Sequence, residues 1–147
     1  MKIQKLKLQL SKSQAPKFPA QVSYCGSAAK VIAIWDTGCD TTSLDINIIK
    51  QLGLKQNKNI PSKKTSTANG DMVSRYFNVD ILFPGEPSNF LFKNFLISDH
   101  GILDVTEDDK NKPKYLLVGM DIIEKGIFVL QPQDNHNIAI WIMLMQE

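Results

Sequence analysis

Short apolar segments separated by turn-forming residues occupy most of the chain, and this pattern limits the possible folds more than any other feature of the sequence. Near the N-terminus, apolar and polar residues alternate with the period of a strand. Further segments have the length and composition of strands: 18–24, 31–35, 90–97, 115–118, 127–130 and 138–145. The 147 residues match one domain of roughly 150 residues. The sequence therefore predicts a single, mostly β domain over 1–147, closed into a barrel.

One short helix and one hairpin interrupt this pattern. A helix is predicted between Asp45, which can cap its N-terminus, and Gly53, which can end it. The stretch 65–83 predicts a hairpin, because Asn69 and Gly70 are a favoured pair for the centre of a two-residue turn. A single helical turn is expected from Asp121 to Lys125, closed by Gly126.

Composition and charge exclude several classes of function. The net charge is only +2, and Arg75 is the one arginine, so binding to nucleic acid is not expected. The longest apolar run has far fewer residues than the roughly 20 of a membrane-spanning helix, and the first residues contain no apolar signal core. We therefore expect no membrane association and a cytoplasmic location. Two cysteines and two histidines leave little for a metal site, so no metal or cofactor is expected.

The triplet Asp36-Thr37-Gly38 is the strongest candidate for chemistry. It follows the nearly apolar run 32–35, which delivers a carboxylate out of a buried strand into a glycine turn. A carboxylate among apolar residues costs stability and is seldom placed there for that purpose. A non-catalytic strand-end turn is the alternative interpretation.

The segment AIWDTGCDTTSLD resembles the active-site signature of the retropepsin-like aspartic proteases. Leu52-Gly53-Leu54, the hairpin residues Thr67 to Gly70 and the stretch Tyr115 to Ile123 match further motifs of these proteins in order and spacing. The resemblance covers about residues 18–131. It implies a closed β-barrel of the acid-protease type, with one lobe in each chain and the terminal strands at the dimer interface.

The resemblance also implies the mechanism and the site. In these proteases two aspartates share one proton and activate a water that attacks the peptide bond. This chain has one such triplet, so a homodimer would have to supply two copies of Asp36. By the same resemblance, Thr37 would bond across to the loop of the other subunit and hold the catalytic pair rigid. Gly38 would place its backbone against the substrate, and Asp40 would contact the main chain of a polypeptide substrate. The hairpin residues Ala68, Asn69 and Gly70 would cover that substrate.

Two residues depart from the pattern of the family. Viral members carry Arg where this chain has Met120, so Asp40 lacks that partner. Pepsin-like members usually carry Ser or Thr where this chain has Cys39, and a thiol is a poor donor. We therefore expect a pH optimum nearer neutrality than that of pepsin-like enzymes. A catalytically silent module for dimerisation or peptide binding is the alternative function.

Several other features have plain structural interpretations. The apolar segment 138–145 is either a central strand of the chain or a strand at the subunit interface. Asp121 is interpreted as a helix N-cap, and the Asp99-His100 pair as part of a surface loop. The acidic residues within 98–114 predict a solvated loop rather than a calcium site.

Overall fold

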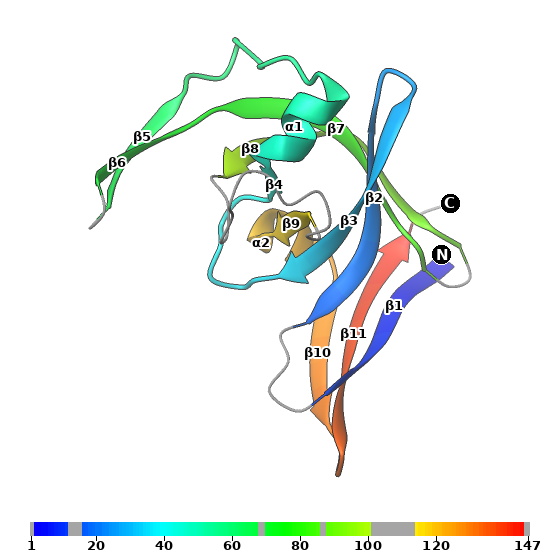
Figure 1. Cartoon of the computed structure of the whole chain (residues 1–147). Helices are drawn as coiled ribbons and strands as arrows, with labels where there is room; N and C mark the ends of the chain where they lie inside the picture. Colours follow the sequence, from blue (N-terminus) through cyan, green and yellow to red (C-terminus); the bar gives the residue numbers. More distant parts are fainter. Residues whose placement is uncertain (1, 12–15, 68–69, 86–87, 101–113, 146–147) are drawn as a thin grey trace.

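The computed structural model describes residues 2–11, 16–67, 70–85, 88–100 and 114–145. Eleven strands and two short helices follow one another along these residues (Figure 1). Their bounds are β1 Lys2–Ser11, β2 Lys17–Tyr24, β3 Ser27–Trp35, β4 Ser43–Asp45, α1 Ile46–Leu52, β5 Lys63–Thr67, β6 Gly70–Ser74, β7 Tyr76–Phe83, β8 Phe90–His100, β9 Tyr115–Val118, α2 Met120–Ile123, β10 Ile127–Pro132 and β11 His136–Met145. None of the described helices is long and apolar enough to cross a membrane.

Six strands close into a barrel in the order β2-β3-β9-β4-β8-β7, which confirms the predicted mostly β fold. Residues of β2 and β3 alternate between buried and exposed positions, as the period of the sequence predicts. The core of the barrel contains Trp35, and its aromatic neighbours are Phe18, Phe83, Phe128 and Trp141. Trp35, the residue immediately before Asp36, is therefore part of the apolar core.

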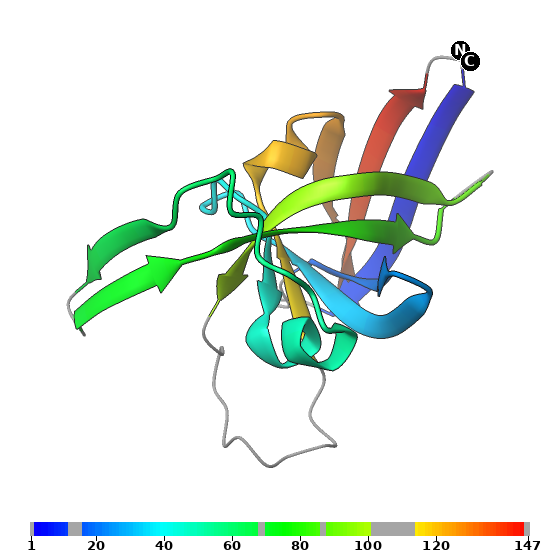
Figure 2. The same cartoon turned by 90° about the horizontal axis from the view of Figure 1, so that it is seen from above.

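Two smaller sheets flank the barrel. The strands β1, β11 and β10 form one of them, and the hairpin β5–β6 forms the other and extends away from the barrel (Figures 1 and 2). Because β11 lies between β1 and β10, both of its edges are paired within the chain. Ala139 and Trp141 on its inner face are fully buried. The segment 138–145 is thus a central strand of this chain.

The helix and hairpin predictions hold in outline. Asp45 caps α1 by accepting a hydrogen bond from the Asn47 N–H at 2.8 Å, and Gly53 ends the helix in the left-handed conformation. The hairpin differs in register, because Gly70 pairs with Thr67 and is therefore the first residue of β6 rather than a central residue of the turn. Ala68 and Asn69 lie outside the described residues.

Candidate active site

Asp36 lies at the point where β3 leaves the barrel. The Asp36 N–H donates to the Val118 carbonyl at 2.9 Å, which continues the parallel pairing of β3 with β9 by one residue. Beyond this point the chain turns, and the Cys39 N–H donates back to the Asp36 carbonyl at 3.2 Å. The apolar strand predicted from the sequence therefore carries a half-buried carboxylate to the rim of the core.

Both carboxylate oxygens of Asp36 have donors from its own turn. The Gly38 N–H donates to Oδ1 at 2.9 Å, and the Cys39 thiol donates to Oδ2 at 3.4 Å. A Cβ at Gly38 would lie 3.2 Å from Oδ1, so glycine lets the backbone approach this closely. Thr37, Gly38 and Asp40 are exposed on the same turn. The turn therefore orients Asp36, and the exposed residues of the turn are open to solvent or to a partner.

The thiol of Cys39 has a raised pKa. Burial is the largest cause, and the hydrogen bond to Asp36 raises the pKa further, as do the negative charges of Asp36 and Asp40. A raised pKa keeps the thiol protonated, which makes it a donor to Asp36 and a weak nucleophile. The structure therefore gives the Cys39 thiol the place of a donor to Asp36.

Thr42 and Asp121 fix the far end of the turn. Thr42 is fully buried, and its N–H and hydroxyl donate to the two carboxylate oxygens of Asp121 at 2.9 and 2.6 Å. The Thr42 hydroxyl in turn accepts from the Gly119 N–H at 3.1 Å. Asp121 is therefore not an N-cap, because Gly119 occupies that position of α2. The sequence interpretation was wrong since this partner lies 79 positions away along the chain.

Gly119 brings α2 against the turn. Its missing side chain matters, because a Cβ there would lie 2.8 Å from the Cys39 carbonyl oxygen and 2.8 Å from the Thr41 carbonyl carbon. The backbone N–H groups of Met120 and Asp121 then donate to the carbonyls of Cys39 and Asp40 at 2.7 and 3.2 Å. The predicted Gly119 motif and the Asp-Thr-Gly motif are thus brought together into one structure.

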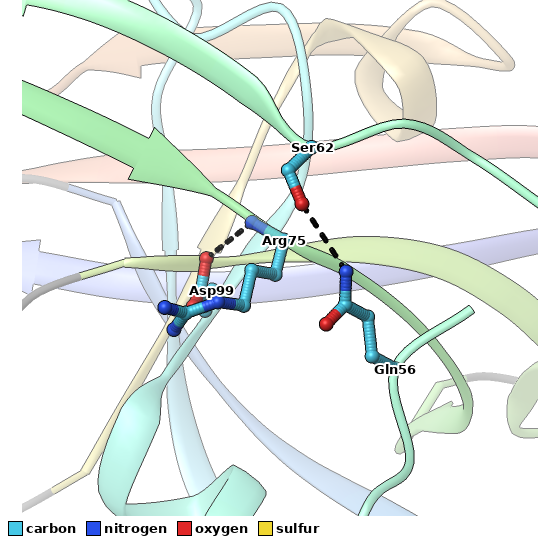
Figure 3. A network of polar contacts seen from close by, with 4 residues as sticks. All are labelled: Gln56, Ser62, Arg75 and Asp99. Atoms are coloured by element: carbon cyan, nitrogen blue, oxygen red, sulfur yellow. Dashed lines mark hydrogen bonds and ion pairs between the residues drawn. The ribbon is translucent and has the colours of Figure 1, made fainter. Parts of the chain in front are cut away.

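The hairpin β5–β6 extends from the barrel on the side where the chain leaves β3 and turns toward β4 (Figures 1 and 2). Of its predicted substrate contacts only Gly70 is described, and it is exposed with φ of +115°. At the base of the hairpin the Arg75 N–H donates to Asp99 Oδ1 at 2.8 Å (Figure 3). Asp99 belongs to β8 and its side chain is only 8% exposed, so the prediction of a surface loop was wrong.

No metal site is present in the part of the chain that is described: no three histidine, cysteine, aspartate or glutamate side chains gather there. The acidic residues at 104 and 107–109 lie outside the described residues. Within the described part, the carboxylates of Asp45, Asp99 and Asp121 are each committed to donors of the fold. The Gly38 and Cys39 donors to Asp36 both come from its own turn.

No protein-family model matches the chain, and no curated protein matches it by sequence. Among solved structures, a retropepsin-like aspartic protease from Rickettsia conorii is similar, with a TM-score of 0.45 and 16% sequence identity. The similarity covers 99% of this chain and 97% of that one. At this level it concerns the fold only, and no residue is assigned a role from it.

Proposed function

We propose that this chain is an aspartic endopeptidase whose active site is completed by a second copy of the chain. The observation that carries the proposal is the geometry of Asp36, a carboxylate held by the Gly38 N–H at the end of a buried strand. One such carboxylate would take a proton from a water that attacks the peptide carbonyl. The other, protonated, would donate to the carbonyl oxygen. A polypeptide substrate, a homodimer and a cytoplasmic location are all parts of this proposal.

In this proposal the second carboxylate comes from another molecule. The sequence contains one Asp-Thr-Gly triplet, and Asp45, Asp99 and Asp121 are occupied by the donors described above. A two-fold axis beside the turn would place two copies of Asp36 together. Thr37 and Gly38, which are exposed on the same turn, would then lie at that axis.

The strand β10 offers a surface for this second copy. Its outer edge has no strand partner in the described part of the chain, and Ile127, Val129 and Leu130 are 61%, 40% and 50% exposed. The strand carries no charge, so two copies would pair without repulsion, unlike the lysine-rich edge strand β1. Phe128 stacks on Trp35 at 6.0 Å between ring centroids, which connects this edge to the strand that ends at Asp36.

Replacing Asp36 tests the chemistry. Asp36→Asn keeps the size of the side chain and should reduce cleavage of a peptide library by about a thousandfold or more, while the fold by circular dichroism is unchanged. Mixing equal amounts of wild-type and Asp36→Asn chains and letting subunits exchange should leave about one quarter of the activity, since random pairing makes only that share of wild-type dimers. Half of the activity would mean that each chain works alone.

Charging β10 tests the dimer. Val129→Lys should produce monomers in sedimentation experiments and abolish cleavage, because two like charges would meet near the axis. Leu91→Lys is the matched control, since Leu91 is also half exposed but lies on β8. A dimer that persists with Val129→Lys contradicts the β10 interface. A dimer that binds peptides and never cleaves them supports the silent binding module instead.

The expected pH optimum nearer neutrality stays a prediction. The Cys39 thiol donates to Asp36 over 3.4 Å, and a hydroxyl there would be the stronger donor. Cys39→Ser should therefore move the acid limb of the pH–rate profile to lower pH, since hydrogen bonds to a carboxylate favour its charged form. An acid limb that stays in place or moves upward would contradict this role of the thiol.

A further inference from the structure

Asp99 lies at a junction between the hairpin and the candidate active site. On one side of β8, Ser98 pairs with Tyr76, the first residue of β7 after the hairpin. On the other side, Asp99 pairs in parallel with Leu44 of β4, the strand that follows the turn of Asp36. The Ser98 N–H also donates to the carbonyl of Thr42 at 3.1 Å. The end of β8 therefore contacts both the hairpin base and the turn.

Three contacts join Asp99 to Arg75, the single residue between β6 and β7 (Figure 3). The Arg75 N–H donates to Oδ1 at 2.8 Å, the Asp99 N–H donates to the Arg75 carbonyl at 3.1 Å, and the Arg75 guanidinium lies 3.7 Å from Oδ2. If the β7–β8 ladder continued, the Arg75 N–H would donate to a backbone carbonyl of β8. Here it donates to the Asp99 carboxylate instead. Hydrogen bonds to charged acceptors are stronger than neutral ones.

The segment that leads into β5 is held by separate hydrogen bonds to β7. The Asn57 N–H donates to the Tyr76 carbonyl at 2.7 Å, and the Asn57 amide donates to Asn78 Oδ1 at 2.8 Å. Gln56 donates to Ser62 at 3.2 Å just before β5 begins (Figure 3). Beyond the base, β5 and β6 form a sheet of their own two strands. The position of the whole hairpin is therefore decided at its base.

We propose that Asp99 is a positioning residue that fixes the hairpin β5–β6 relative to the turn of Asp36, a role that rests on the proposed endopeptidase function. A hairpin fixed at its base before the substrate arrives loses less conformational freedom when a peptide binds. Asp99 thereby contributes to the affinity for an extended polypeptide without touching it. The link runs from Arg75 through Asp99 and Ser98 to Thr42 of the turn.

The experiment removes the contacts of Asp99 one at a time in the full-length chain. Asp99→Ala should speed hydrogen exchange of the amides in 70–75 about tenfold and raise KM for peptide by a similar factor, with kcat changed less than twofold. Asp99→Asn keeps an oxygen acceptor for the Arg75 N–H and should have a smaller effect. Arg75→Gln loses only the guanidinium and should have the smallest effect.

A matched control and two contrary results complete the test. Lys64→Gln removes the 3.1 Å ion pair with Asp71 inside the hairpin and should change neither the exchange of the base nor KM. The proposal is overturned if Asp99→Ala leaves the amides of 70–75 unchanged, or if exchange rises equally throughout the barrel. Hydrogen exchange can be measured without catalysis. If the protein never cleaves peptides but Asp99→Ala still speeds exchange at 70–75, the endopeptidase function is refuted, and the role of Asp99 in positioning the hairpin stands.

Discussion

The turn at Asp36 is fixed by residues 79 positions away in the sequence, whereas the hairpin β5–β6 is held by pairing between its own strands and by contacts at its base. Thr42 in the turn is fully buried, while Met72 and Val73 in the hairpin are about half exposed. A catalytic carboxylate must be oriented before the reaction, and a covering hairpin must admit the substrate. The two regions differ in the way that these two tasks of the proposed endopeptidase would require.

Gly119→Ala should give the largest loss of stability. The new methyl group would meet backbone atoms of Cys39 and Thr41 at 2.8 Å, and backbone cannot move aside without deforming the turn. We expect the free energy of unfolding in urea to fall by about 3 kcal/mol. Gly70→Ala in the hairpin is the comparison: it has a positive φ but nothing within 4 Å of the new Cβ, so the loss should be about 1 kcal/mol. Equal losses would break the contrast.

Thr42→Val should destabilise the turn by an intermediate amount. The substitution leaves a part-buried oxygen of Asp121 and the buried Gly119 N–H without the hydroxyl that they contact at 2.6 and 3.1 Å. An unsatisfied buried polar group costs about 2 kcal/mol, measured again by urea unfolding. Thr41→Val is the matched control, because Thr41 is exposed beside it. Similar stabilities of the two variants would show that the Thr42 contacts do not hold the turn.

Alkylation of Cys39 reports on the charge inside the turn. Because burial, Asp36 and Asp40 raise its pKa from the ordinary value of 9.0, the rate of alkylation should keep rising with pH above 9. Asp36→Asn removes one of these causes, lowers the pKa of the thiol and should speed alkylation at pH 8 several-fold. Cys25 is exposed and serves as the internal reference in mass spectrometry. An unchanged ratio of Cys39 to Cys25 labelling would contradict the coupling.

Val73→Ser should have the smallest effect. Val73 is 49% exposed in the hairpin, so its replacement should change the free energy of unfolding by about 0.5 kcal/mol or less. Val79→Ser is the counterpart in the barrel, where the side chain is 2% exposed and the loss should be several times larger. A large loss at Val73 would mean that the hairpin packs against apolar surface, and the contrast with the turn would weaken.

Local signals explain which predictions succeeded. Most barrel strands were predictable from apolar periodicity, and α1 from the capping residue Asp45 and the terminal Gly53. The three-residue barrel strand β4 was not predicted, because it is too short to show a period. The register of the hairpin was missed by one residue, because pairing of Gly70 with Thr67 depends on both strands. Asp99 and Asp121 were assigned local roles because short sequence windows do not contain their partners, which lie 24 and 79 positions away.

The sequence by itself determined most of the barrel strands, the helix α1 and the position of Asp36 at the end of a buried strand. These features depend on residue type and spacing within about ten positions, where backbone geometry and burial act directly. Tertiary structure decided that β11 lies between β1 and β10, that Asp121 holds Thr42, and that Asp99 holds the base of the hairpin. Such hydrogen bonds require closed sheets to bring distant residues within 3 Å, and only the folded chain does that.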